Sequence, residues 1–270
     1  MKKTVSRLLT LLLIAAAVSC EIVETGPEVS GEGFCASLES HSCATRTMLS
    51  GSSVLWTEGD TIVVFKSSSI SDSHLFCLDP ADDGKANGHF SEAGYEDYYS
   101  SACYAFYPAS MAGTVSGSSL TVNLPAVQYY RDGSFDRNAN PAFAVSGGDG
   151  KLAFKNLCGL ISVAVNTAEA ISEVKITTAA EEALWGTGTV DMGSSPKLVM
   201  DKSITPEQKS LVLKVYKPGD DGQFVNVGPS SDSSDGILKG DEDPTQVFLF
   251  VVPVGTLAQG FTVTTTTTTG

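Results

Sequence analysis

Residue types that carry out chemistry are present in this 270-residue chain, but their spacing forms no recognisable catalytic or metal-binding motif. The three histidines, His41, His74 and His89, are not spaced as in a metal-binding H-x-x-x-H pair. The chain has no G-x-S-x-G motif, and no cysteine has a plausible histidine partner for nucleophilic catalysis. A glycosidase-type pair of carboxylates depends on spatial proximity, which the sequence does not define. We therefore expect a protein that is not an enzyme and that uses no cofactor or metal.

Two acidic segments resemble calcium-binding loops only in composition. Counting from Asp79, an EF-hand loop needs an acid at its third residue and Glu at its twelfth. The chain has Ala81 and Phe90 at these positions. The acidic residues between 232 and 243 have no ligand spacing either. We interpret both segments as solvated loops.

Four tyrosines are the best candidates for a binding surface. They belong to an aromatic run that ends at a proline, and they are Tyr98, Tyr99, Tyr104 and Tyr107. Aromatic rings can stack on the apolar faces of sugars, so the run could form a carbohydrate-binding platform. An aromatic run of this density is more often core and sheet packing. The sequence favours packing and leaves carbohydrate binding as the alternative.

The N-terminus is typical of a bacterial lipoprotein signal peptide, residues 1–19. Three basic residues precede an apolar run from Leu8 to Val18, which is too short to span a bilayer. Cys20 follows small residues and resembles the acylated cysteine of a lipobox, although Ala17 stands where Leu is favoured. The alternative is ordinary cleavage after Ser19, which would leave a free thiol. We expect lipidation of Cys20 and anchoring in a membrane by its acyl chains.

Composition excludes some classes of partner. Seventeen basic residues against 31 acidic ones give a formal net charge of −14. Such a chain has no basic patch to displace counterions from phosphates, so we expect no nucleic-acid partner. Hydrophobic residues make up 42% of the chain, which indicates a globular protein.

Residues 20–46 are expected to form a polar leader, either a tether or a removable strand. The segment is rich in Glu, Ser and Gly, but Phe34, Ala36 and Leu38 alternate as in a strand. Cys35 and Cys43 also lie here, and the sequence leaves open whether they form a disulfide. The other cysteines follow later in the chain, and two of them are expected to be small buried residues: Cys77 and Cys103.

The remaining residues are expected to fold as β-strands. Thr61–Phe65 is a β-branched and aromatic run that follows a turn at Glu58-Gly59-Asp60. Because the run is apolar at consecutive positions, both faces of this strand should be covered. Trp56, just before the turn, is expected to belong to the core.

The spacing of the strands predicts an all-β protein with two sandwich domains in tandem. The glycine-rich segment Ser146–Lys151 resembles a phosphate loop, but Leu152 stands where Ser or Thr is needed. We interpret it as a domain joint or a tight turn. The predicted domains are residues 47–147 and residues 148–270.

Several segments in a fixed order resemble the fimbrillin family of Gram-negative surface pili. They are the lipobox-like leader, Thr45-Arg46-Thr47, W-x-x-G-D-x-I-x-V-F, Y-x-A-F-Y-P, L-P-x-x-Q, F-K-N-x-C-x-L-I-x-V and Phe248-Leu-Phe-Val-Val-Pro253. The resemblance runs from Cys20 to the end of the chain. It implies two transthyretin-like sandwiches and an outer-membrane lipoprotein that contributes to adhesion. It also implies assembly with other subunits by strand donation after a protease cuts at Arg46, although some members keep the lipid and leader.

The last residues of the chain predict an unprotected strand. Phe261 and Val263 share one face of a Thr-rich segment that ends at Gly270. We interpret the second sandwich as truncated, with a subunit that lacks a donor strand as the alternative. Taken together, the expectation is a lipid-anchored pilus subunit or anchor at the cell surface. The runner-up is a carbohydrate-binding surface lipoprotein.

Overall fold

The computed structural model describes residues 33–39, 55–131, 133–167, 169–193, 195–218, 224–226, 245–255 and 257–267. Within these residues the protein is all-β, as predicted: strands are joined by turns and by 3-10 helices of three or four residues. These short helices are η1 (Pro80–Asp82), η2 (Glu96–Tyr98), η3 (Ala109–Met111), η4 (Arg137–Ala139) and η5 (Pro206–Lys209). No helix in this part of the chain is long and apolar enough to cross a membrane.

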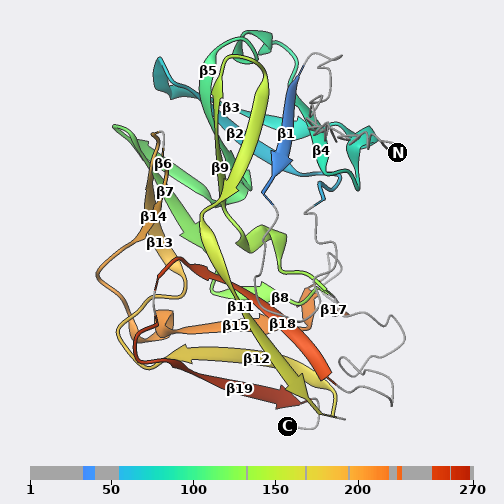
Figure 1. Cartoon of the computed structure of the whole chain (residues 1–270), viewed down its shortest axis with the longest axis vertical. Coiled ribbons are helices and arrows are strands. Elements are labelled where there is room, and N and C mark those ends of the chain that lie inside the picture. The colour runs from blue at the N-terminus through green and yellow to red at the C-terminus, as the bar shows by residue number, and fades with distance from the viewer. Residues whose placement is uncertain are drawn as a thin grey trace, which may run out of the picture.

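A closed seven-stranded barrel forms one end of the molecule (Figure 1). Each strand in the following order is hydrogen-bonded to the next, and the last returns to the first. The order is β1 (Phe34–Leu38), β10 (Lys151–Asn156), β9 (Ala142–Gly147), β5 (Ala102–Tyr107), β2 (Thr61–Lys66), β3 (Ser69–Leu78) and β4 (Asn87–Ser91).

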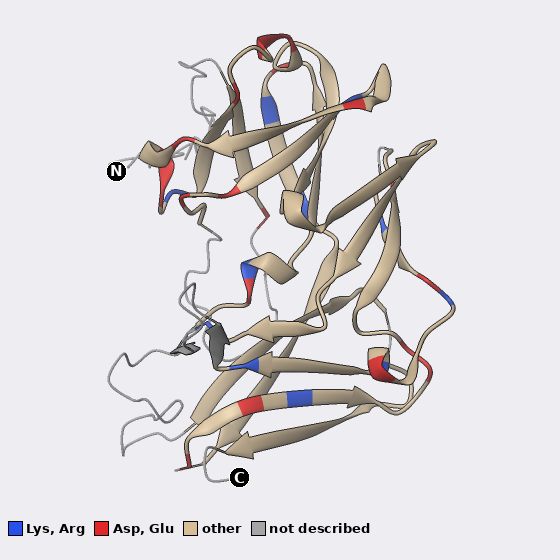
Figure 2. Ribbon diagram, turned by 180° about the vertical axis from the view of Figure 1, so that it is seen from behind, with Lys and Arg blue, Asp and Glu red and all other residues tan. Residues whose placement is uncertain are grey.

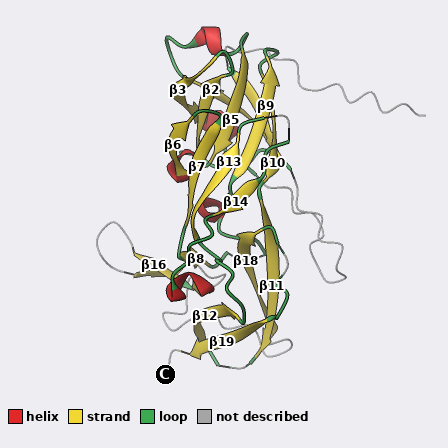
Figure 3. Cartoon of the chain, turned by 90° about the vertical axis from the view of Figure 1, so that its left-hand side faces the viewer, coloured by secondary structure: helices red, strands yellow, loops and turns green. Residues whose placement is uncertain are grey.

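Four smaller sheets continue from the barrel toward the other end of the molecule, so the protein is elongated (Figure 3). One four-stranded sheet is β14 (Leu198–Met200), β13 (Gly186–Asp191), β7 (Ser119–Leu124) and β6 (Ala112–Ser116). A second is β19 (Phe261–Thr267), β12 (Ile171–Thr178), β15 (Ser210–Lys214) and β8 (Val127–Tyr129). Two pairs complete the set: β11 (Cys158–Asn166) with β18 (Thr245–Pro253), and β16 (Tyr216–Pro218) with β17 (Phe224–Asn226).

Strand β2 is covered on both faces, which confirms the interpretation of its apolar run. Ile62 and Val64 point into the barrel, where they belong to its interior core. Val63 and Phe65 point outward into a second core, which includes side chains of β7 and β13. A strand buried on both sides has no place for the polar residues of an alternating pattern.

Strand β18 joins the second core to a third in the same manner. Leu249 and Val251 belong to the core beneath the barrel. Phe248 and Phe250, on the opposite face, pack in a core shared with β12 and β15. Three hydrophobic cores therefore follow one another along the molecule, and β2 and β18 are the walls between them.

The segment Ser146–Lys151 is a tight turn and not a joint between sheets. It connects β9 to β10, which pair with each other within the barrel. Gly148 and Gly150 have φ of 97° and 70°, values that glycine adopts without strain. The boundary predicted after residue 147 therefore divides this barrel. Strands from the two sides of it also pair elsewhere, β7 with β13 and β8 with β15.

Candidate functional site

Strand β1 is the feature of the barrel that stands out as a candidate site. It is the described part of the predicted leader, residues 20–46, and it forms the strand that the alternation of Phe34, Ala36 and Leu38 allowed. It runs parallel to β10 and antiparallel to β4, and it closes the barrel between them; Figure 1 shows β1 in blue at this end of the molecule. The other six barrel strands lie between residues 61 and 156. A short segment of the predicted leader therefore completes a barrel whose other six described strands come later in the chain.

Phe34 anchors β1 inside the barrel. Its side chain is fully buried, and its ring meets those of Phe76 and Tyr99 edge-on, with centroids 5.2 Å and 5.0 Å away. Edge-to-face packing of this kind adds to the energy of area burial. Leu38, at the other end of the strand, is half-buried against the same core. The strand is thus held by apolar side chains as well as by its ladders.

Trp56 holds the middle of β1. The indole is fully buried, and its Nε1–H donates to the backbone carbonyl of Ala36 at 2.9 Å. The ring also packs edge-on against Phe90, with centroids 4.8 Å apart. On β4, Gly88 lies opposite Ala36, and a Cβ at position 88 would lie 2.8 Å from the Trp56 ring. Two small residues side by side therefore make room for the indole. The sequence indicated that Trp56 is core, but it did not indicate this partner.

The outer face of β1 brings a cysteine and a histidine together, which sequence reasoning missed. Cys35 lies opposite His89 on β4 and opposite Lys151 on β10. The His89 ring Nδ1 is 2.8 Å from Asp82 Oδ2. Burial raises the pKa of the Cys35 thiol, and this effect outweighs the lowering of the pKa by the neighbouring Lys151. A protonated thiol is a poor nucleophile, so this arrangement does not favour catalysis. Within the described residues, no group of three His, Cys, Asp or Glu side chains could hold a metal ion.

Asp82 fastens the turn before β4. Its carboxylate accepts hydrogen bonds from Lys85 Nζ at 2.7 Å and from the His89 backbone N–H at 2.8 Å. Burial raises the pKa of this carboxyl, but the hydrogen bonds from Lys85 and His89 outweigh burial and lower the pKa to about 2. The charged form is therefore bound more tightly in the folded state than in the unfolded one.

This lowered pKa predicts a loss of stability in acid. A carboxyl whose pKa is lower in the folded state stabilises the protein fully above its unfolded pKa, near 4. That contribution disappears as the pH falls from about 4 to about 2. We expect Asp82→Asn to lower the free energy of unfolding by about 1–2 kcal/mol at pH 7, and by much less at pH 2.5. Urea melts at the two pH values measure this, and an equal loss at both would contradict it.

The four tyrosines proposed as a binding platform are mainly packing residues. Tyr98 and Tyr107 are buried, and their hydroxyls donate to Asp72 Oδ1 at 2.6 Å and Asp60 Oδ1 at 3.1 Å. Tyr99 and Tyr104 are half-buried against the cores. Burial raises the pKa of both the Tyr98 and the Tyr107 hydroxyl. Buried rings offer no face to a sugar, so the arrangement fits the packing interpretation.

The remaining predicted sites divide into described and undescribed residues. Cys103 is buried as expected, whereas Cys77 is exposed, because its side chain points out of β3 between the buried Phe76 and Leu78. Cys20, Cys43 and Arg46 lie outside the described residues, as do the signal peptide, the acidic segment 232–243 and Gly270.

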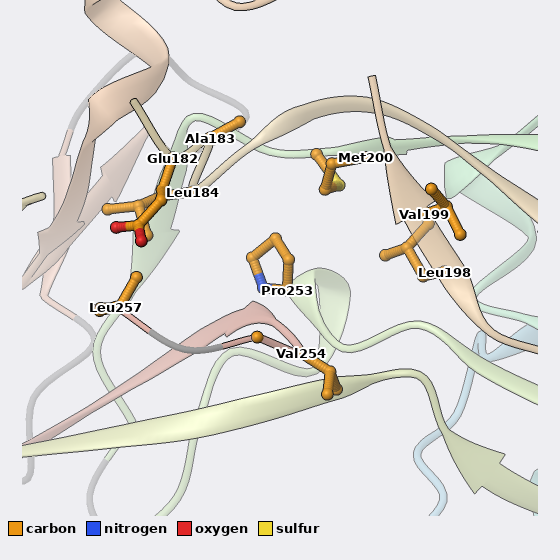
Figure 4. A pocket seen from close by; sticks show the side chains of 10 residues that line it. Glu182, Ala183, Leu184, Leu198, Val199, Met200, Pro253, Val254 and Leu257 are labelled. Carbon is orange, nitrogen blue, oxygen red and sulfur yellow. The ribbon is translucent and has the colours of Figure 1, made fainter. Parts of the chain in front are cut away.

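A second surface feature is an apolar pocket of about 380 Å³ beside β14 (Figure 4). Its walls include Leu198, Met200, Pro253 and Val254, and Glu182 is its charged residue. The Lys and Arg residues of the described part of the chain are spread over several elements (Figure 2). The pocket has no convergent set of polar groups of the kind that orients a small ligand.

Comparison with known proteins returned no significant match, whether to a protein-family model, a curated protein or a solved structure.

Proposed function

We propose that this protein is a fimbrillin-like lipoprotein of the cell surface, a pilus subunit or anchor that assembles by strand exchange and contributes to adhesion. The observation that supports this proposal best is the position of β1. A five-residue strand from the leader closes the barrel and buries Phe34 and Ala36 completely. A strand from another subunit with the same pattern could take the same place.

The energetics of the barrel without β1 favour replacement of the strand. Its departure would leave β4 and β10 with unpaired backbone groups and would open an apolar groove lined by Phe76, Phe90 and Trp56. Burial of Phe34 and Leu38 alone contributes on the order of 5 kcal/mol as an upper estimate. Exposed strand edges beside an apolar groove are a ready template for another strand.

The fimbrillin resemblance supplies the rest of the proposal. Lipidation of Cys20 would anchor the precursor in the outer membrane, and cleavage at Arg46 would cut the leader just after β1. Both residues lie outside the described part of the chain, so their roles rest on the sequence alone. The alternative, a carbohydrate-binding lipoprotein that uses the tyrosine run, is less well supported because Tyr98 and Tyr107 are buried.

Cleavage at Arg46 is expected to convert the protein from a monomer into oligomers. Treatment of the purified mature protein with an Arg-specific protease should release the leader and give ladders on non-boiled gels. Arg46→Lys should remain monomeric under the same treatment. Arg131→Lys, which changes an exposed arginine elsewhere, is the matched control and should form the same ladders as the unchanged protein. Ladders that form equally in Arg46→Lys, or release of the leader without ladders, would count against strand exchange.

A further inference from the structure

The middle of β1 lies beside a crowded position of the barrel, because a Cβ at Gly88 would lie 2.8 Å from the Trp56 ring. Ala36 pairs with Gly88 on one side and with Leu152 on the other. Trp56 is fully buried, and its ring lies against Gly88. Its polar contact with β1 is the hydrogen bond that Nε1–H donates to the Ala36 carbonyl. Because Ala36 lies opposite Gly88, where even a Cβ would crowd the indole, we expect a large side chain at position 36 to disturb this hydrogen bond.

The end of β1 near Phe34 has the opposite requirement. Phe34 lies among Phe76, Tyr99 and Phe90, the residue with which it pairs on β4. Without a ring at position 34 these aromatic side chains would border a cavity, which costs more than the lost burial alone. A large aromatic side chain is therefore required two residues before the small one.

We infer that the barrel selects the strand that replaces β1 by one spacing rule, with Trp56 as the residue that enforces it. The accepted segment is an extended stretch of another protein chain with the pattern aromatic, a small residue in the buried place of Cys35, Ala or Gly, any residue, aliphatic. It enters parallel to β10 and antiparallel to β4, as Phe34-Cys35-Ala36-Ser37-Leu38 does. This inference rests on the proposed function, because it specifies the partner of the same site.

The rule predicts which positions tolerate change. Leu at position 36 collides with the buried indole or displaces it, and the hydrogen bond to the backbone is then lost. Position 37 points to the outer face of the barrel, opposite Asn87 and Ala153. The same residue, Leu, is therefore far better accepted at position 37 than at position 36. Loss of the Phe34 ring removes the largest fully buried side chain of the strand.

Peptide exchange into the folded protein tests the rule. The full chain carries a specific protease site in place of residues around Arg46 and is cut after folding, so that no covalent link joins β1 to the rest of the barrel and another strand can replace it. Fluorescent peptides that span residues 33–39 are then added in excess, and their incorporation is followed by polarisation and native mass spectrometry. The variants are the unchanged peptide, Ala36→Leu, Phe34→Ala and the size-matched control Ser37→Leu.

We expect the unchanged peptide and Ser37→Leu to bind within about fivefold of each other, and Ala36→Leu and Phe34→Ala to bind at least about 100-fold more weakly. Equal binding of Ala36→Leu and Ser37→Leu would overturn the selection rule and leave strand exchange intact. A chain that is verified as cut but takes up no peptide would overturn the proposed function and this inference together.

A measurement on the uncut chain keeps the rule testable without exchange. In a Trp185→Phe background, the fluorescence of Trp56 reports the environment of its indole. Ala36→Leu should shift this emission to the red and lower the midpoint of urea unfolding, whereas Ser37→Leu should change neither. An Ala36→Leu protein with unchanged emission and midpoint would show that Trp56 places no demand on position 36.

Discussion

Replacement of Trp56 by alanine is expected to lower the free energy of unfolding by about 3–5 kcal/mol. The indole is fully buried among the rings of Phe90, Tyr107 and Phe154, so its removal leaves a large cavity in the barrel. The change also removes the hydrogen bond that holds the Ala36 carbonyl, which then lies buried without its indole donor. Urea unfolding followed by circular dichroism measures the loss.

Two variants separate the contributions of packing and hydrogen bonding. Trp56→Phe keeps much of the apolar volume but cannot donate, so it should lose about half as much stability as Trp56→Ala. Leu75→Ala, on a half-exposed side chain of β3, should lose less than about 1 kcal/mol. A loss of less than 1 kcal/mol in Trp56→Ala itself would mean that the indole is not part of the core.

Replacement of Gln128 by leucine is expected to cost about 2–4 kcal/mol. The Gln128 side chain lies against β18, where its Nε2 donates to the Val251 carbonyl at 2.7 Å and its Oε1 accepts from the Val251 N–H at 2.9 Å. Both residues are buried. The amide thus pairs with the backbone as a neighbouring strand would, and Leu would leave both groups of Val251 without these partners.

The variant Gln128→Glu should lose stability by an amount that depends on pH. A carboxylate can accept from the Val251 N–H, but its second oxygen would face the Val251 carbonyl and repel it. Protonation restores a donor, so Gln128→Glu should lose more stability at pH 7 than at pH 4.5, relative to the unchanged protein. Thermal melts at the two pH values check this.

For Gln128→Leu, a loss of unfolding free energy smaller than 0.5 kcal/mol would show that water replaces the amide.

Local sequence patterns were sufficient for strand β2 and for the class of the fold. The run Ile62-Val63-Val64-Phe65 is apolar at every position, and a strand of that kind is stable only between two covered faces. The same reasoning holds for β18, where alternate residues enter different cores. Such patterns depend on the two faces of a strand, which neighbouring residues along the chain already define.

Local patterns were insufficient where residues distant in the chain meet. The glycine turn at residues 148–150 has the composition of a linker, but it closes a hairpin because β9 and β10 pair across it. The weak alternation of Phe34 and Ala36 also did not show that β1 would complete a barrel with β10, more than 110 residues later in the chain. Pairing of this kind depends on edges and grooves that exist only after the other strands have folded.

The amino-acid sequence therefore determined the all-β class and the strands covered on both faces, because these follow from short β-branched and aromatic runs of consecutive apolar residues, and it indicated the burial of Trp56 beside such a run. The tertiary structure decided that β1 closes the barrel and that Trp56 bonds to Ala36 and packs over Gly88. These contacts join residues 20 and 32 positions apart, and their geometry depends on how three strands align across a barrel. The sequence supplies the side chains for these contacts, but only folding brings them within a few ångströms of one another.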